Sequence, residues 1–224
     1  MRSFAMSLIA FVFLLIPACS QVPAIRPDAG LMGRPGAEVC CRKDCLPFVV
    51  VPHRLVHAIE ARLPDGTITS ALGIVLVDPR EGSLHCVLMT PEGFVLLDAV
   101  DDRRLTTVQQ GVPPFDQPAF AEGMMADIRL MLLPPMGKQR DAGLLKDNVA
   151  VCRYSDDEGG VTDVIARNGD SREIRQYDMS GFLRRSIRLS EARKHGIFGK
   201  IELDAPGFTG YSLRLTLLEA ESLE

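Results

Sequence analysis

The chain of 224 residues lacks tryptophan, and aromatic residues make up only 6% of it. Aromatic side chains form the stacking surfaces of many single-strand nucleic-acid sites and carbohydrate clefts, so their scarcity disfavours both kinds of site. An excess of positive charge is also missing, because 29 acidic residues outnumber 25 Lys and Arg and give a net charge of −4. Nucleic acid attracts proteins with a basic surface, so we expect no nucleic-acid partner.

Recognisable catalytic motifs are missing too. The sequence contains no G-x-S-x-G, H-E-x-x-H or G-x-x-x-x-G-K pattern, which mark serine hydrolases, zinc peptidases and phosphate-binding loops. The histidines are scattered and are interpreted as surface or strand residues rather than catalytic bases. We therefore expect no enzymatic activity, no catalytic residues and no cofactor. The four histidines are His53, His57, His85 and His195.

Long hydrophobic runs are missing outside the N-terminus. There, an apolar run from residue 4 to residue 18 follows Arg2. A membrane-spanning helix needs about 20 apolar residues, so this run is short for a bilayer span and typical of a signal peptide. We expect residues 1–18 to be a leader that directs export.

The end of this leader, Leu15-Ile16-Pro17-Ala18-Cys19, resembles the lipobox of bacterial lipoproteins. In such proteins the cysteine thiol receives a diacylglycerol, the leader is cut before it, and the new N-terminus is acylated. The resemblance implies that Cys19 is a lipid anchor, with Ser20 favouring the outer membrane, although Pro17 departs from the commoner Ala or Ser. Several acyl chains together hold a protein at a membrane. The alternative is ordinary cleavage near Ala24, which would release a soluble periplasmic protein.

Proline and glycine recur between residues 20 and 38, a composition that forms neither helix nor strand. This segment is interpreted as a tether between lipid and domain. We assign residues 19–50 to the lipidated tether and residues 51–224 to one domain, which is long enough to bury a core.

Five cysteines follow Cys19, and disulfides are the default in an oxidising compartment. Their odd number allows at most two bonds within the chain and leaves at least one thiol free. The spacing does not fix the pairing. Cys86 and Cys152 lie in strand-like runs and are interpreted as buried small hydrophobic residues. The five are Cys40, Cys41, Cys45, Cys86 and Cys152.

Cys40, Cys41 and Cys45 lie near His53 and His57 in the sequence, and these residue types can bind a metal ion. The C-C-x3-C spacing of the cysteines matches no structural zinc site, so we expect no metal.

The acidic run 156–158 is interpreted as a solvated turn, with weak Ca²⁺ binding as the alternative. A basic cluster is interpreted as a solvated face, with contact to lipid phosphates or a partner as the alternative. Its members are Arg184, Arg185, Arg188, Arg193 and Lys194.

One stretch, residues 116–133, has a sustained helical period. Asp116 is the expected N-cap, Pro118 suits the first turn, and Pro134-Pro135 ends the helix. This helix is interpreted either as a plain core element or as one that half-fills a groove for a ligand, to which flexible methionines would adapt. Its apolar face comprises Phe120, Ala121, Met124, Met125, Ile128, Met131 and Leu132, and Glu122 and Arg129 point away from it.

Short alternating runs flank the helix and predict an antiparallel sheet. Residues 136–147 between them are polar, and we expect no regular structure there. So many strands must twist and curl, which leaves an apolar concave face for the helix to lie on. The eleven expected strands are 55–63, 67–77, 84–90, 94–100, 104–109, 148–154, 161–167, 172–177, 182–189, 199–203 and 211–219.

Together, the lipobox cysteine, the hairpin 84–97, the helix ending at Pro134-Pro135 and the closing strands 172–219 resemble the outer-membrane lipoprotein localisation factors, the LolA/LolB-like family. The resemblance implies a mainly β fold, an open half-barrel of about eleven strands with one helix as plug on the concave face. In the LolB branch a hairpin tip carries Pro-Leu-Gly, whereas this chain has Pro91-Glu92-Gly93. A carboxylate resists entry into hydrocarbon, so the chain looks like a LolB-like lipoprotein of unassigned role.

The resemblance implies an outer-membrane lipoprotein that faces the periplasm and holds acyl chains of lipids or lipoproteins for transfer or localisation. Phe120, Met124, Ile128 and Met131 are the expected ligand-binding residues. We expect a monomer, with lipid or lipoprotein as cargo and the membrane as partner. The alternative is a non-catalytic structural or assembly lipoprotein that serves as a docking platform.

Overall fold

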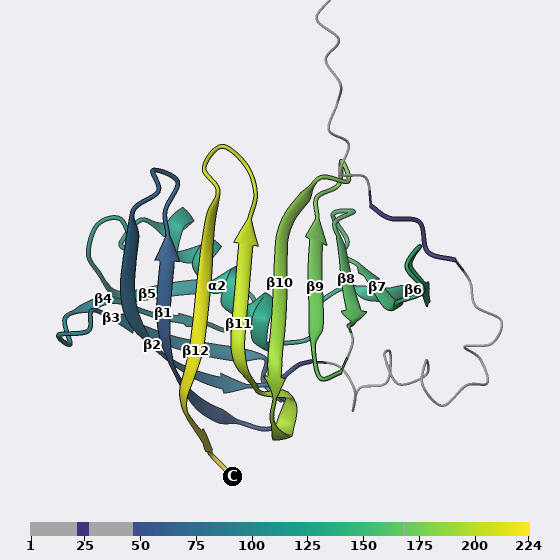
Figure 1. Cartoon of the computed structure of the whole chain (residues 1–224). Coiled ribbons are helices and arrows are strands. Elements are labelled where there is room, and N and C mark those ends of the chain that lie inside the picture. The colour runs from purple at the N-terminus through teal and green to yellow at the C-terminus, as the bar shows by residue number, and fades with distance from the viewer. Residues whose placement is uncertain (1–21, 27–46, 168) are drawn as a thin grey trace, which may run out of the picture.

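A single antiparallel sheet of twelve strands makes up most of the protein (Figure 1). The computed structural model describes residues 22–26, 47–167 and 169–224. The strand order is β5-β4-β3-β2-β1-β12-β11-β10-β9-β8-β7-β6, so the first and last strands of the domain pair at its centre. The edges β5 and β6 are not paired with each other, and the sheet is therefore open. The expected mainly β fold with an open antiparallel sheet is confirmed, and the described residues contain one α-helix.

The strands are connected in sequence, and one α-helix separates β5 from β6. Because these two strands lie at opposite edges, the connection that carries the helix must cross the sheet. The elements are β1 (His53–Arg62), β2 (Ile68–Asp78), β3 (Ser83–Met89), β4 (Val95–Asp101), β5 (Thr106–Gly111), α2 (Pro118–Leu132), β6 (Lys138–Leu144), β7 (Ala150–Ser155), β8 (Val161–Ala166), β9 (Arg172–Tyr177), β10 (Leu183–Ala192), η2 (Lys194–Gly196), β11 (Phe198–Ala205) and β12 (Tyr211–Ser222).

Alternation of apolar and polar residues places one face of the sheet in the core. In β11, Ile201, Leu203 and Ala205 are buried, whereas Lys200 and Glu202 between them are exposed. Successive side chains of a strand point to opposite faces, so this pattern gives each strand one inner face. The inner faces of both halves of the sheet join one core cluster with α2.

The helix begins two residues later than its expected cap. Its N-cap is Gln117, without a side-chain cap hydrogen bond, so the prediction of Asp116 as N-cap is wrong. Pro118 occupies the first turn, where a missing N–H leaves no hydrogen bond unmade. The helix ends at Leu132, because Leu133 is already extended and prolines follow.

The prediction of no regular structure for residues 136–147 is wrong. Residues 138–144 form strand β6, which pairs with β7 and brings the count to twelve instead of eleven. Five of its seven residues are exposed, so an edge strand of this kind has no alternating pattern to reveal it.

Two short parts of the range assigned to the tether contact the sheet. Phe48 and Val49 are buried in the core cluster. Arg26 exchanges two backbone hydrogen bonds with Leu144 of β6, and the Arg153 guanidinium donates to the Pro23 carbonyl oxygen at 2.8 Å. Residues 1–21 and 27–46, including Cys19, Cys40, Cys41 and Cys45, lie outside the described residues, and the expectations for them stay predictions.

Candidate functional site

The helix lies on the concave face over β3, β4 and β5. On the side of α2 that faces the sheet, Ala121 and Met125 are fully buried, and Leu132 is also buried. Met125 follows Ala121 by about one turn and Leu132 follows Met125 by about two turns, so the three residues lie on the side of the helix that packs on the sheet. The expectation that α2 buries an apolar side is therefore confirmed for this part of the helix.

The four predicted ligand-binding residues form a stripe along one flank of α2. Phe120 is 45% exposed, Met124 and Ile128 are half-buried against the core cluster, and Met131 is only 4% exposed. The stripe thus changes from open at the first turn to closed at the last turn. Phe115 packs edge-on against Phe120, with ring centroids 5.2 Å apart, and extends the apolar surface beyond the helix.

A buried carboxylate, Asp127, lies beside this stripe. It is 4% exposed, and the Arg185 guanidinium of β10 donates to it at 2.7 Å. The Tyr211 hydroxyl of β12 also donates to Asp127, and Arg185 lies over the Tyr211 ring at 5.4 Å. Burial and the Asp127 carboxylate raise the pKa of Tyr211 well above its ordinary value. We call these three residues the Asp127 clamp.

A second ion pair holds the other flank of the helix. Arg129 pairs with Asp101 at the end of β4, and it donates to the carbonyl oxygen of Gly82 at 3.0 Å. We call this contact the Arg129 clamp. Arg129 does point away from the apolar side, as expected, but it contacts the sheet and its side chain is only 11% exposed.

Sequence reasoning missed the Asp127 clamp. Its signal was present, because Asp127 follows Met124 by three residues and precedes Met131 by four, which places it on the apolar flank. A charge at such a position needs a buried partner. The partner, Arg185, was instead assigned to a solvated basic face.

Three members of the basic cluster, all on β10, have acidic partners. Arg188 pairs with Glu202 at 3.4 Å, and Arg184 approaches Asp178 at 3.9 Å. Together with Arg185 in the Asp127 clamp, three of the five basic side chains are thus neutralised locally.

Within the described residues, His53, His57 and His85 and both cysteines lie in strands, and His195 lies in η2. Burial lowers the pKa of His57 to about 4, so its ring is uncharged at neutral pH. Cys86 is free and buried, and burial raises its pKa to about 12. Cys152 is buried, as expected, and it is disulfide-bonded. Among the residues that the structure describes, no three His, Cys, Asp or Glu side chains form a group that could hold a metal ion.

The acidic run 156–158 forms a turn. The Asp156 carboxylate accepts hydrogen bonds from the backbone N–H groups of Glu158 and Gly160, at 3.1 and 2.7 Å. These contacts fit the interpretation of a turn.

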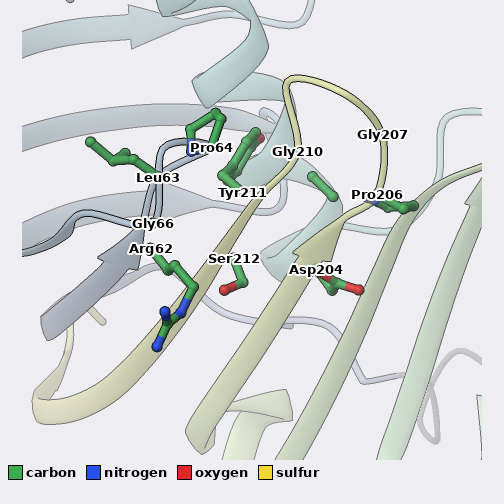
Figure 2. Close-up of a pocket in the computed structure, with 11 residues that line it drawn as sticks. Arg62, Leu63, Pro64, Gly66, Asp204, Pro206, Gly207, Gly210, Tyr211 and Ser212 are labelled. Carbon is green, nitrogen blue, oxygen red and sulfur yellow. The ribbon is translucent and has the colours of Figure 1, made fainter.

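Two surface pockets lie away from the helix. The first, of about 330 Å³, lies between the β1–β2 turn and the β11–β12 loop and includes Leu63 and Tyr211 (Figure 2). The second, of about 450 Å³, lies beside Pro23 and Arg167. Neither is lined by a residue of α2, so neither coincides with the predicted ligand-binding stripe.

No helix within the described ranges combines the length and hydrophobicity that a membrane crossing requires. No family model matches the sequence, and no curated protein matches it. Among solved structures, the chain is similar to a LolA superfamily protein from Nitrosomonas europaea, with 14% identity and a TM-score of 0.53. The similarity covers 84% of this chain and 93% of that one. The chain therefore has a LolA-like fold.

Proposed function

We propose that the protein is an outer-membrane lipoprotein that holds acyl chains between α2 and the concave face of its sheet. The observation that carries this proposal is the stripe from exposed Phe120 to buried Met131, on a helix laid across an open sheet. The LolA-like fold supports it, because the structural neighbour belongs to the LolA superfamily.

An acyl chain would enter beside Phe120 and slide toward Met131. Each methylene removed from water contributes about 0.8 kcal/mol, so a chain of moderate length binds without any polar contact. Met124 and Met131 suit such a site, because the unbranched thioether repacks at low cost when the site fills and empties. No catalytic step is part of this function.

The stripe can be tested with a fluorescent fatty acid and the full-length protein. Met124→Lys places a charge in the stripe and should weaken binding at least tenfold. Ala126→Lys is the matched control, because it adds the same charge to the same helix at an exposed position and should leave binding unchanged. Circular dichroism verifies that both variants are folded. Equal affinity in both variants, or no uptake by the folded wild type, would reject the proposal.

The membrane location rests on the lipobox. Expressed in a Gram-negative host, the wild-type protein should fractionate with the outer membrane and carry acyl groups on Cys19. Cys19→Ala should release it from the membrane fraction. Mass spectrometry of the mature N-terminus that shows cleavage near Ala24 and no acylation would replace this part of the proposal with a soluble periplasmic protein.

A docking platform that never carries lipid is the second candidate. It is favoured by the complete burial of Ala121 and Met125 and by the position of both pockets away from α2. A stable protein partner, together with no fatty-acid uptake by the folded protein, would favour this candidate over the first.

A further inference from the structure

Three neighbouring turns lie at one end of the sheet. They are the β1–β2 turn (63–67), the β9–β10 turn (178–182) and the β11–β12 loop (206–210), all at the top of Figure 1. The acidic β7–β8 turn (156–160) adjoins them, because a Cβ atom placed on Gly159 would be 3.8 Å from the Met179 Cβ. The strands that carry them, β2-β1-β12-β11-β10-β9, are consecutive in the sheet. We call this the hairpin end. The β3–β4 turn lies at the left of Figure 1, apart from the other three turns. We do not include it in the hairpin end.

The hairpin end exposes large apolar side chains. Phe208 is fully exposed, Met179 is 80% exposed, and Phe182 and Leu63 are about half exposed. Single exposed apolar residues are ordinary, but several on adjacent turns mark a surface that contacts something apolar.

The charged groups of these turns are occupied within the turns. The Asp178 carboxylate accepts the N–H groups of Ser180 and Phe182, at 2.9 and 3.0 Å. The Asp65 carboxylate accepts the N–H of Thr67 at 2.9 Å. The turns are thereby ordered, and their large apolar side chains stay exposed.

The chain also reaches this end close to its predicted anchor. Val22 lies beside the β9–β10 turn, because a Cβ atom placed on Gly181 would be 3.6 Å from a methyl carbon of Val22. Residues 22–26, purple in Figure 1, run from there toward β6. Cys19 precedes Val22 by three residues, which span at most about 11 Å. An acyl group on Cys19 would therefore enter the bilayer close to the hairpin end.

We propose that the hairpin end docks on the lipid bilayer and inserts Leu63, Met179, Phe182 and Phe208 into its interface. This inference rests on the proposed acylation of Cys19. The three turns offer two acids, the adjoining β7–β8 turn offers three more, and Arg62 and Arg184 lie just below them. The net charge at this end therefore gives no attraction to anionic lipid. The apolar side chains supply the affinity, and the surface binds phosphatidylcholine as well as anionic lipid.

The absence of tryptophan provides a clean test. Phe208→Trp introduces a single tryptophan at the hairpin end, and Leu105→Trp introduces one at an exposed position of the opposite end. Both are prepared as full-length acylated protein in phosphatidylcholine vesicles that contain brominated lipid, which quenches tryptophan at the depth of the bromine. We expect at least threefold stronger quenching, and a blue shift, for Phe208→Trp.

Equal quenching of the two tryptophans, or stronger quenching at Leu105→Trp, would overturn the proposed orientation. A wild-type protein without acyl groups on Cys19 would overturn its premise. Fatty-acid binding is a separate readout. Loss of that binding with Phe208→Trp still quenched would reject the lipid-carrier function and retain the docking surface.

Discussion

The two ends of the sheet differ in what their turns present. The hairpin end carries Phe208 and Met179, whereas the opposite end carries Arg80 and Glu81 on the β2–β3 turn and exposed Arg193 to His195 between β10 and β11. Exposed apolar residues lie beside these turns as well. The Val50 N–H donates to the His195 carbonyl oxygen, and Leu223 adjoins Glu224, which pairs with Arg80. Exposed Leu105 lies in the β4–β5 turn. The hairpin end thus exposes the larger apolar side chains, whereas the opposite end exposes apolar and charged side chains together.

The helix is attached differently at the two ends. Asp127 binds Arg185 and Tyr211 near the hairpin end, whereas Arg129 binds Asp101 near the opposite end. The ligand-binding stripe lies on the Asp127 flank. We expect a movement that opens the Asp127 clamp to expose the stripe toward the hairpin end, and we expect the Arg129 clamp to stay closed during it.

The largest expected effect comes from removing the apolar side chains that distinguish the hairpin end from the opposite end. Replacing all four apolar residues of the hairpin end by serine, in a Cys19→Ala background without an acyl anchor, should lower binding to phosphatidylcholine vesicles about a thousandfold. The reason is that each inserted side chain contributes on the order of 1 kcal/mol or more. Vesicle flotation measures this, with Leu105→Ser in the same background as control. An equal loss in that control would contradict the contrast.

Removing the cation of either clamp should destabilise the protein by about 3 kcal/mol, because it leaves a buried carboxylate without its partner. Arg185→Met and Arg129→Met should therefore show similar falls in urea midpoint. Only Arg185→Met should speed fatty-acid exchange, measured by stopped-flow fluorescence. Faster exchange in Arg129→Met, with Arg185→Met unchanged, would reverse the assigned roles of the clamps.

The smallest expected effect comes from His57, which lies in the sheet between the two ends. Its pKa is lowered to about 4 from 6.5, so the unfolded state binds more protons between these pH values. Stability should be full above pH 6.5 and fall as pH approaches 4, by on the order of 3 kcal/mol. His57→Leu should flatten that part of the urea-midpoint profile without affecting vesicle binding. An unchanged profile would show that burial of His57 does not govern acid stability.

Strands with clear alternation could be predicted from sequence, and so could the single helix, because periodicity reports which side chains are buried. Strand β6 could not, since an edge strand with exposed side chains leaves no pattern. The Asp127 clamp could not be assembled either, because it joins residues 58 and 84 positions apart. In the sequence, Asp127 looks like an ordinary charged residue of a helix, Arg185 like a surface residue, and Tyr211 like an ordinary strand residue.

The most direct test of the lipid-carrier function is to locate a bound acyl chain. The full-length protein is incubated with a fatty acid that carries a photoreactive diazirine near its end, irradiated and mapped by peptide mass spectrometry. We expect labels on Met124, Ile128 or Met131 of α2, reduced by an excess of unlabelled fatty acid. Labels confined to the hairpin end, or no labels that unlabelled fatty acid reduces, would contradict a lipid site beneath the helix.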